Sequence, residues 1–131
     1  MFLDASAIVA VLAREPDWEV LALKIAPPRQ VIVSPLVIYE AVLGLVRSQS
    51  CEVETAEILV DQFLKQAGAA LVTIDEPIGG IAVAAFSRFG KGRHKASLNM
   101  GDCFAYACAR HHRVPLLFKG DDFVHTDIRV A

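Results

Sequence analysis

The chain has 131 residues, 54% of them hydrophobic, which is enough for one domain with a real core and too few for two. Its formal net charge of −2 argues against a protein that coats nucleic acid with its whole surface, so any nucleic-acid contact must be local. We therefore expect a single domain over residues 1–131.

Cysteine usage and the start of the chain indicate the compartment. The three cysteines form an odd set, and the first residues lack a basic segment followed by a cleavage pattern. These features predict a reduced, cytoplasmic setting. The longest charge-free stretch, 77–87, falls far short of the roughly 20 residues that span a bilayer, so no membrane role is expected.

The first half of the chain alternates between strand and helix patterns. A strand is expected at 1–3, a helix of small and branched residues at 5–13, a short helix at 17–26 closed by Pro27 and Pro28, and a strand at 31–33. Ser34 and Pro35 form an N-cap and first-turn pair, which predicts a helix to about residue 48, and an amphipathic helix follows at 52–67.

The second half continues the alternation. It predicts a strand at 70–74, a helix at 77–89, a polar and basic loop at 90–100, a helix at 102–112, a strand at 115–118 and a fifth strand at 128–130. Strands that alternate with helices favour an α/β fold with a mainly parallel sheet between helical layers. Ligands of such sheets gather at the carboxyl ends of the strands.

Acidic residues interrupt apolar sequence at four places. They are Asp4, Glu40, Asp102 and the pair Asp121 and Asp122. An ionised acid in a core-like segment is costly unless it is paired or binds a metal ion. We expect these acids to converge on one site that binds Mg²⁺ or Mn²⁺, the hard cations that carboxylate oxygens favour.

Each acid also has a plain structural explanation. Asp4 and Asp102 could be helix N-caps, and one of Asp121 and Asp122 could belong to a turn. Glu40 lies one and a half turns into its helix, where capping is impossible, and its alternative is an ion pair with a buried Arg or Lys. The acids favour a common site because all four places fall at or near the same predicted sheet edge.

Metal ions held by carboxylates suit phosphodiester hydrolysis, because they activate a water without any nucleophilic side chain. The basic residues Arg88, Lys91, Arg93 and Lys95 precede Asp102 and could engage a phosphate backbone, although a solvated loop is the alternative. A second basic group at 110–113 is explained by favourable interaction with the end of its helix.

Three segments give the chain a resemblance to a known family. They are the opening 1–7, the run 89–94 leading into 98–104, and the run 115–123 with Thr-Asp-Ile at 126–128. On these segments the chain resembles the PIN-domain family, and specifically its VapC-type toxins of bacterial toxin–antitoxin modules. The resemblance covers essentially the whole length.

The resemblance implies a three-layer α/β/α sandwich and a Mg²⁺-dependent endoribonuclease, with Mn²⁺ as a substitute. It implies a cognate VapB-like antitoxin as partner, seated in an apolar groove for which the helices at 5–13 and 35–46 are candidate walls, and a homodimer. By resemblance Asp4, Glu40 and Asp102 are the first three metal-site acids, and either Asp121 or Asp122 is the fourth. Ala5 departs from the expected Thr, which leaves Ser6 as the supporting hydroxyl.

Two other functions remain open at this point. One is a PIN-fold binding module without catalytic activity. The other is a receiver-like domain in which a Mg²⁺ pocket serves phosphoryl transfer to an Asp. A receiver-like pocket needs adjacent acids after the first strand, whereas Asp4 stands alone there.

Overall fold

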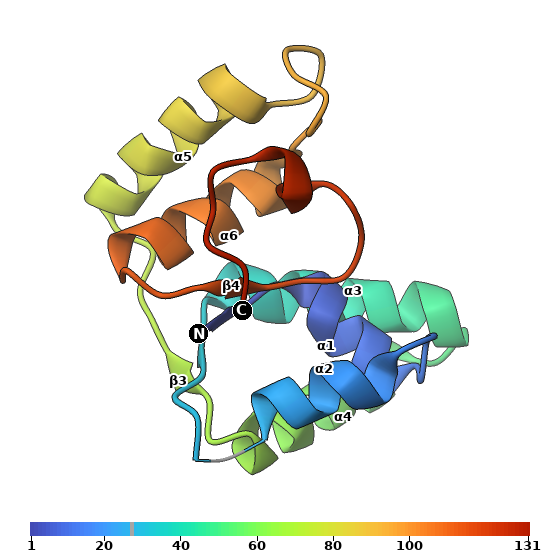
Figure 1. Ribbon diagram of the computed structural model, residues 1–131. Helices are drawn as coiled ribbons and strands as arrows, with labels where there is room; N and C mark the ends of the chain where they lie inside the picture. Colours follow the sequence, from blue (N-terminus) through green and yellow to red (C-terminus); the bar gives the residue numbers. More distant parts are fainter. Residues whose placement is uncertain (27) are drawn as a thin grey trace.

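The computed structural model describes residues 1–26 and 28–131 (Figure 1). One sheet contains four short strands, namely β1 (Phe2–Leu3), β2 (Ile32–Val33), β3 (Ala70–Leu71) and β4 (Leu116–Leu117). All neighbouring strands run parallel in the order β3-β2-β1-β4. The structure confirms the predicted parallel α/β architecture. Pro27, expected to help close the second helix, lies outside the described residues.

Helices cover both faces of this sheet. They are α1 (Ala5–Leu12), α2 (Trp18–Ile25), α3 (Pro35–Gln49), α4 (Val53–Gln66), α5 (Glu76–Phe89) and α6 (Met100–His111). Figure 1 shows α5 and α6 on one side of the sheet and α1 to α4 on the other. This is the expected three-layer α/β/α sandwich.

The core explains why such short strands suffice. Phe2, Leu3, Leu116 and Leu117 are almost completely buried, because helices cover β1 and β4 on both sides. Strands covered on both faces appear in a sequence as continuous apolar runs, as both of these do.

The strand order reverses at β1. From β1 the chain runs outward through β2 to β3, and it then returns to the opposite side of β1 to form β4. Ligands of such sheets bind where the strand order reverses, outside the carboxyl ends of the strands. The backbone continues the pairing at this point, since Asp4 N donates to Leu117 O at 2.9 Å. The fold therefore directs attention to the residues that follow β1 and β4.

Two predicted elements differ from the structure. The helix expected to begin at Asp102 begins at Met100, because Asn99 provides its N-cap. The fifth strand expected at 128–130 is reduced to one isolated bridge between Leu116 and Val130, and an unpredicted 3₁₀ helix, η1 (Phe123–His125), precedes it. Both differences lie in segments without a long apolar pattern. There, single hydrogen bonds and caps decide where an element begins and ends.

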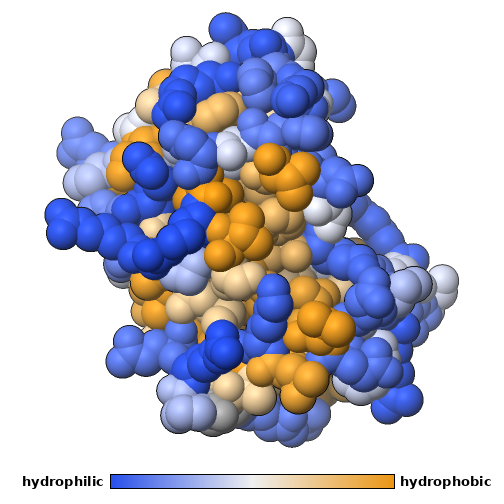
Figure 2. Space-filling model, in the orientation of Figure 1, coloured by the Kyte–Doolittle hydropathy of each residue, from blue (hydrophilic) through white to orange (hydrophobic). Residues whose placement is uncertain are grey.

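The surface retains exposed apolar side chains, among them Leu23, Val83 and Met100. In Figure 2 hydrophobic side chains gather along the middle of the face shown, with hydrophilic side chains on either side. Contiguous apolar surface of this kind marks interaction sites in soluble proteins. No helix within the described residues is long and apolar enough to cross a membrane.

Candidate active site

Asp4 directly follows β1 and begins the candidate site. Its side chain is 5% exposed, and its Oδ2 accepts hydrogen bonds from Ser6 N, at 2.9 Å, and from Ser6 Oγ. The carboxylate therefore does cap α1, as its structural explanation required. Both bonds end on Oδ2, so Oδ1 is not committed to them.

Ser6 also connects Asp4 to the segment that follows β4. Its Oγ accepts a hydrogen bond from Lys119 N at 3.0 Å, and the Lys119 ammonium donates to Pro16 O at 2.6 Å. The Ser6 hydroxyl, expected to support Asp4, thus links the segments that follow β1 and β4. This contact joins residues 113 positions apart in the sequence.

Glu40 extends from α3 to the start of α6. Its carboxylate lies so close to Gly101 that a Cβ at position 101 would collide with both carboxylate oxygens. Gly101 is buried, and only glycine leaves room for the acid there. Glu40 of α3 therefore lies against the residue that precedes Asp102 in α6, and it links two helices that cover opposite faces of the sheet.

Asp102 is the third residue of α6, and its side chain is held by the backbone. Its Oδ2 accepts from Asn99 N at 2.8 Å, while Asn99 Oδ1 accepts from Asp102 N at 3.0 Å. This reciprocal pair is a capping box, which satisfies two backbone donors at the helix start. Asp102 therefore has a capping role at the third helical position and not at the N-cap.

The two acids after β4, Asp121 and Asp122, differ in their effect on the other acids. Gly120, at φ +106°, turns the chain, and the two exposed acids Asp121 and Asp122 follow. Burial is the main cause that raises the pKa of both Asp4 and Asp102, and the charge of Asp122 adds to it, which indicates that Asp122 lies near both acids. No such influence comes from Asp121.

The carboxylates repel one another in the absence of a cation. Burial and then the charges of Asp4 and Asp102 raise the pKa of Glu40 to about 7. Burial, followed by the charges of Asp4 and Asp122 against the Asn99 hydrogen bond, raises the pKa of Asp102 to about 6. Burial is also the main cause that raises the pKa of Asp4.

These shifts have a consequence for stability. Between the ordinary carboxyl pKa and about 7, the folded chain holds more protons on Glu40 and Asp102 than the unfolded chain does. The metal-free protein is therefore stabilised at low pH, and it loses that stability as the pH rises through this range.

Ion pairing does not relieve the repulsion. The ion pairs among the described residues join Lys65 to Asp61, Arg88 to Asp127 and Lys119 to Asp17. The alternative that explained Glu40 by an ion pair with a buried Arg or Lys is therefore wrong. Among the described residues, no cationic side chain pairs with Asp4, Glu40 or Asp102.

The donor set fits a hard divalent cation. Within residues 1–26 and 28–131, no three His, Cys, Asp or Glu side chains are already arranged closely enough to enclose an ion. Mg²⁺ does not need such a cage, because it keeps several waters and takes one or two carboxylates directly. The oxygen atoms left free by the capping bonds of Asp4 and Asp102 can supply these contacts.

The basic residues before α6 separate into two groups. Arg88 belongs to the last turn of α5 and pairs with Asp127 at 3.1 Å, so its charge is already used within the protein. Lys91, Arg93 and Lys95 are exposed in the loop, where the Arg93 guanidinium lies 5.0 Å from the Phe86 ring centre. These three remain free to approach a phosphate.

Sequence reasoning missed Asn99 and Gly101. The spacing of Asn99 and Asp102 is that of a capping box, so it could have revealed the true start of α6. Nothing local distinguishes Gly101 from an ordinary helix-start glycine, because its partner Glu40 is 61 positions away in the sequence.

Known proteins share this chain's sequence and fold. The sequence profile of the PIN domain family matches residues 1–129. A VapC ribonuclease of Rhizobium meliloti is 41% identical over 97% of this chain and 98% of its own length. A ribonuclease VapC of Mycolicibacterium smegmatis is also 41% identical, over 98% of this chain and 97% of its own.

Two solved structures have a similar fold. A toxin–antitoxin complex from Klebsiella pneumoniae matches with a TM-score of 0.71 at 19% identity, over 99% of this chain and 95% of that chain. VapC20 of Mycobacterium tuberculosis, described as a sarcin-ricin loop cleaving toxin, matches with a TM-score of 0.69 at 16% identity, over 98% of each chain. At these identities the likeness concerns the fold.

A single methyl group tests the geometry of Glu40. In Gly101→Ala the new Cβ displaces the Glu40 carboxylate, so we expect the affinity for Mn²⁺ to fall about tenfold, the loss typical of disturbing a residue that orients metal ligands. Titration calorimetry of the folded variant measures this affinity. Gly79→Ala in α5 is the matched control, because its Cβ meets no atom within 4 Å. Equal Mn²⁺ affinity in the two variants would show that Glu40 does not need this position.

Proposed function

Because the chain belongs to the PIN domain family, we propose that it is a metal-dependent endoribonuclease and the toxin of a VapBC-like type II toxin–antitoxin system. The observation that carries this proposal is the convergence of Asp4, Glu40, Asp102 and Asp122 outside β1 and β4 without a cationic side chain among them. Such a cluster serves hydrolysis of a phosphodiester bond.

We propose Mg²⁺ as the cation, with Mn²⁺ as a substitute, held by Asp4, Glu40 and Asp102 with Asp122 as the fourth acid. When bound, the ion supplies a water activated as nucleophile and offsets negative charge on the phosphate. The side chains and backbone of the protein position the acids. Ser6 holds one oxygen of Asp4 and Asn99 holds one oxygen of Asp102, which orients the other oxygen of each acid without further ordering.

Glu40 also carries a proton at neutral pH that a cation would displace. With its pKa near 7, it is half protonated at neutral pH in the absence of metal, and neighbouring positive charge would ionise it. Binding of the cation to Glu40 would therefore release this proton. Its contact with Gly101 keeps its carboxylate beside Asp102.

RNA is the proposed substrate, approached through the exposed basic side chains of the loop before α6. Arg93 and Lys95 are the main contacts, because Lys91 also lines the apolar pocket between α5 and α6. These side chains contact phosphates and carry no base code, so they suit single-stranded or looped RNA presented to the acids. The relatives named as ribonucleases support this substrate class.

We propose that a VapB-like antitoxin binds a groove between α3 and α4. This groove, of about 480 Å³, has the apolar side chains Ile38, Ile58 and Leu64 in its walls and the acids Glu54, Glu57 and Asp61 at its border. Charge complementarity favours a basic amphipathic segment. The helix expected at 5–13, the other candidate wall, does not line this groove. Ala7, Ile8 and Ala10 of α1 lie in the core, and its other side chains are half-buried.

The proposed homodimer has a different surface. An apolar pocket of about 470 Å³ lies between α5 and α6 and is lined by Val83, Phe86, Met100 and Phe104 among others. Val83 and Met100 are 70% and 67% exposed, which is unusual for side chains of their size. A second copy of the chain would bury them.

We further propose that residues 1–131 act as a single PIN-like domain in the cytoplasm. One sheet takes its strands from the whole length of the chain, which supports the single domain. Cys51, Cys103 and Cys108 are free thiols, which fits a reducing compartment.

The family assignment removes the receiver-like alternative. A catalytically inactive PIN-fold module stays as the competing proposal, because it would keep the same fold and could keep the metal. Turnover distinguishes the two.

Removing one carboxylate tests catalysis. We expect Asp102→Asn to lower the rate of RNA cleavage at least a hundredfold, because the metal loses a charged ligand while the Asn99 N bond can persist on the amide oxygen. The assay follows cleavage of mixed cellular RNA by the antitoxin-free protein with Mg²⁺, with Mn²⁺ and with chelator. Asp61→Asn, an exposed acid on α4, is the control and should cleave normally. A folded wild-type protein that binds Mn²⁺ and cleaves nothing would support the inactive module.

Two charge insertions test the partner surfaces together. We expect Val83→Glu to be monomeric and still bind the antitoxin, and Ile58→Glu to dimerise and lose antitoxin affinity, because each places a charge in only one apolar pocket. Light scattering of the chain alone and with antitoxin measures both. The assignment of surfaces is wrong if both variants keep both partners.

A further inference from the structure

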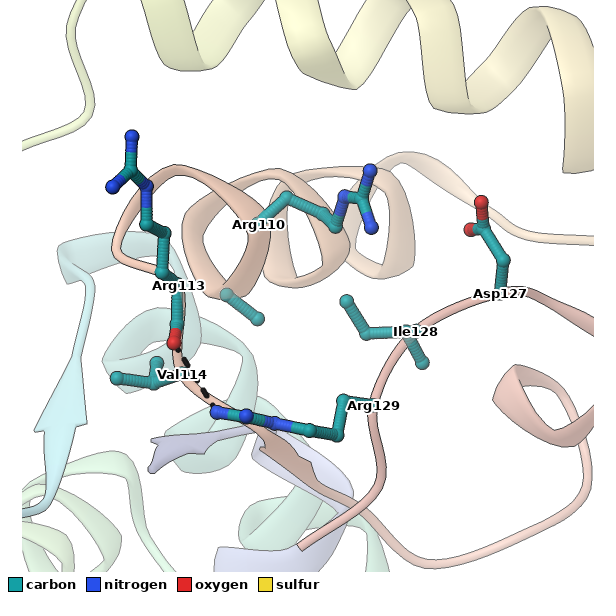
Figure 3. Close-up of a pocket in the computed structure, with 7 residues that line it drawn as sticks. Arg110, Arg113, Val114, Asp127, Ile128 and Arg129 are labelled. Atoms are coloured by element: carbon teal, nitrogen blue, oxygen red, sulfur yellow. Dashed lines mark hydrogen bonds between the residues drawn. The ribbon is translucent and has the colours of Figure 1, made fainter.

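A further pocket, separate from the two described above, lies at the opposite end of α6 from Asp102. It has a volume of about 400 Å³ and is formed by the last turn of α6, the residues after it and the segment 127–129 (Figure 3). Because α6 has 12 residues, its two ends are separated by about 18 Å. The pocket is therefore distinct from the acidic site.

Three arginines border this pocket. Figure 3 shows Arg110 reaching toward Asp127 and Arg129 along the near side with its guanidinium directed at the Arg113 carbonyl. Arg113 lies at the opposite border with its guanidinium turned outward to solvent. Arg129 Nη2 donates to Arg113 O at 3.2 Å, which anchors one guanidinium beside the pocket. Ile128 and Val114 supply apolar wall between them.

The positive charge of this pocket is not balanced. Asp127 is the acid in the lining, and it already accepts hydrogen bonds from Arg88 at 3.1 Å and from Tyr106 Oη at 2.7 Å. None of the ion pairs within residues 1–26 and 28–131 includes Arg110, Arg113 or Arg129. The lining therefore carries three arginines against one acid, Asp127, which Arg110 faces and which already accepts hydrogen bonds from Arg88 and Tyr106.

The surroundings add to the positive potential. Met1 carries the terminal amine, and the charge of Arg129 contributes to lowering its pKa. Interaction with the helix C-terminus explains part of the basic group at 110–113, but it does not explain Arg129, which joins from another segment.

The acidic site creates a need for such a pocket. A polynucleotide is repelled by the acids around Asp102, and a chain of net charge −2 provides no general attraction for it. The affinity of proteins for nucleic acid comes mainly from contacts with phosphates. Arginine is the side chain best suited to them, because its planar guanidinium can donate two parallel hydrogen bonds to one phosphate.

We propose that the pocket bordered by Arg110, Arg113 and Arg129 binds a backbone phosphate of the RNA substrate, remote from the bond that is cleaved. The inference rests on the proposed function, since it names how the same substrate is held. With this pocket, the protein would contact RNA at two separate places. The acidic site would hold the metal and the bond to be cleaved, and the arginine pocket would bind the strand elsewhere.

The experiment compares two variants that remove equal charge. Arg110→Gln/Arg113→Gln alters the pocket, and Arg47→Gln/Lys65→Gln removes two exposed charges from α3 and α4. Binding of a long single-stranded RNA is measured in chelator, so that nothing is cleaved, over a series of NaCl concentrations. Cleavage of a trinucleotide with Mg²⁺, which is too short to reach the pocket, is measured in parallel.

We expect the pocket variant to bind the long RNA about tenfold more weakly than the control variant, with a salt dependence reduced by about one or two phosphate contacts. Both variants should cleave the trinucleotide at the wild-type rate. Equal RNA affinity and equal salt dependence in the two variants would overturn the inference. Loss of binding to polyglutamate without loss of RNA binding would assign the pocket to an acidic peptide instead and would also overturn it.

These outcomes are separate from failure of the proposed function. If wild-type protein cleaves neither RNA while the pocket variant still loses affinity, the ribonuclease proposal fails and the phosphate pocket stands. If all proteins cleave the trinucleotide and bind long RNA equally, the pocket fails and the ribonuclease stands.

Discussion

Burial of carboxylates beyond the carboxyl end of β1, without a cationic side chain paired to them, is the constraint on which the candidate site depends. Asp4 is almost fully buried, and the charges of Glu40, Asp102 and Asp122 act on it or on one another. Burial without a cationic side chain is unfavourable for ionised acids. The fold tolerates the cluster because two helix starts hold the acids through backbone donors.

At both helix starts an Asp carboxylate accepts a hydrogen bond from a backbone N–H. Asp4 caps α1 and Asp102 completes the capping box of α6, each through its Oδ2 atom. A capping bond stabilises a helix by about 1 kcal/mol, and here it also fixes the orientation of the acid. Ser6 and Asn99 are therefore positioning residues whose effect on a metal comes through the acids they contact.

Most of the fold and the main acids are predictable from the sequence, for reasons that are local. The apolar runs of β1 and β4 and the Ser34-Pro35 start of α3 define elements from short windows, and Asp4 and Glu40 stand out against them. Gly101 could not be recognised, because its need for glycine comes from a carboxylate on another layer. The choice of Asp122 over Asp121 likewise depends on how the turn at Gly120 directs the chain.

The central claim is that a divalent cation replaces protons on these acids, and counting the released protons tests it most directly. With the pKa of Glu40 near 7 and that of Asp102 near 6, the pair holds about one proton at pH 6.5 and almost none above pH 8. Titration calorimetry of Mn²⁺ in buffers of different ionisation enthalpy measures the release. We predict that binding of Mn²⁺ releases protons at pH 6.5, from Asp4 as well as from this pair, and that the release from Glu40 and Asp102 disappears above pH 8. Binding of Mn²⁺ without proton release at pH 6.5 would contradict the claim.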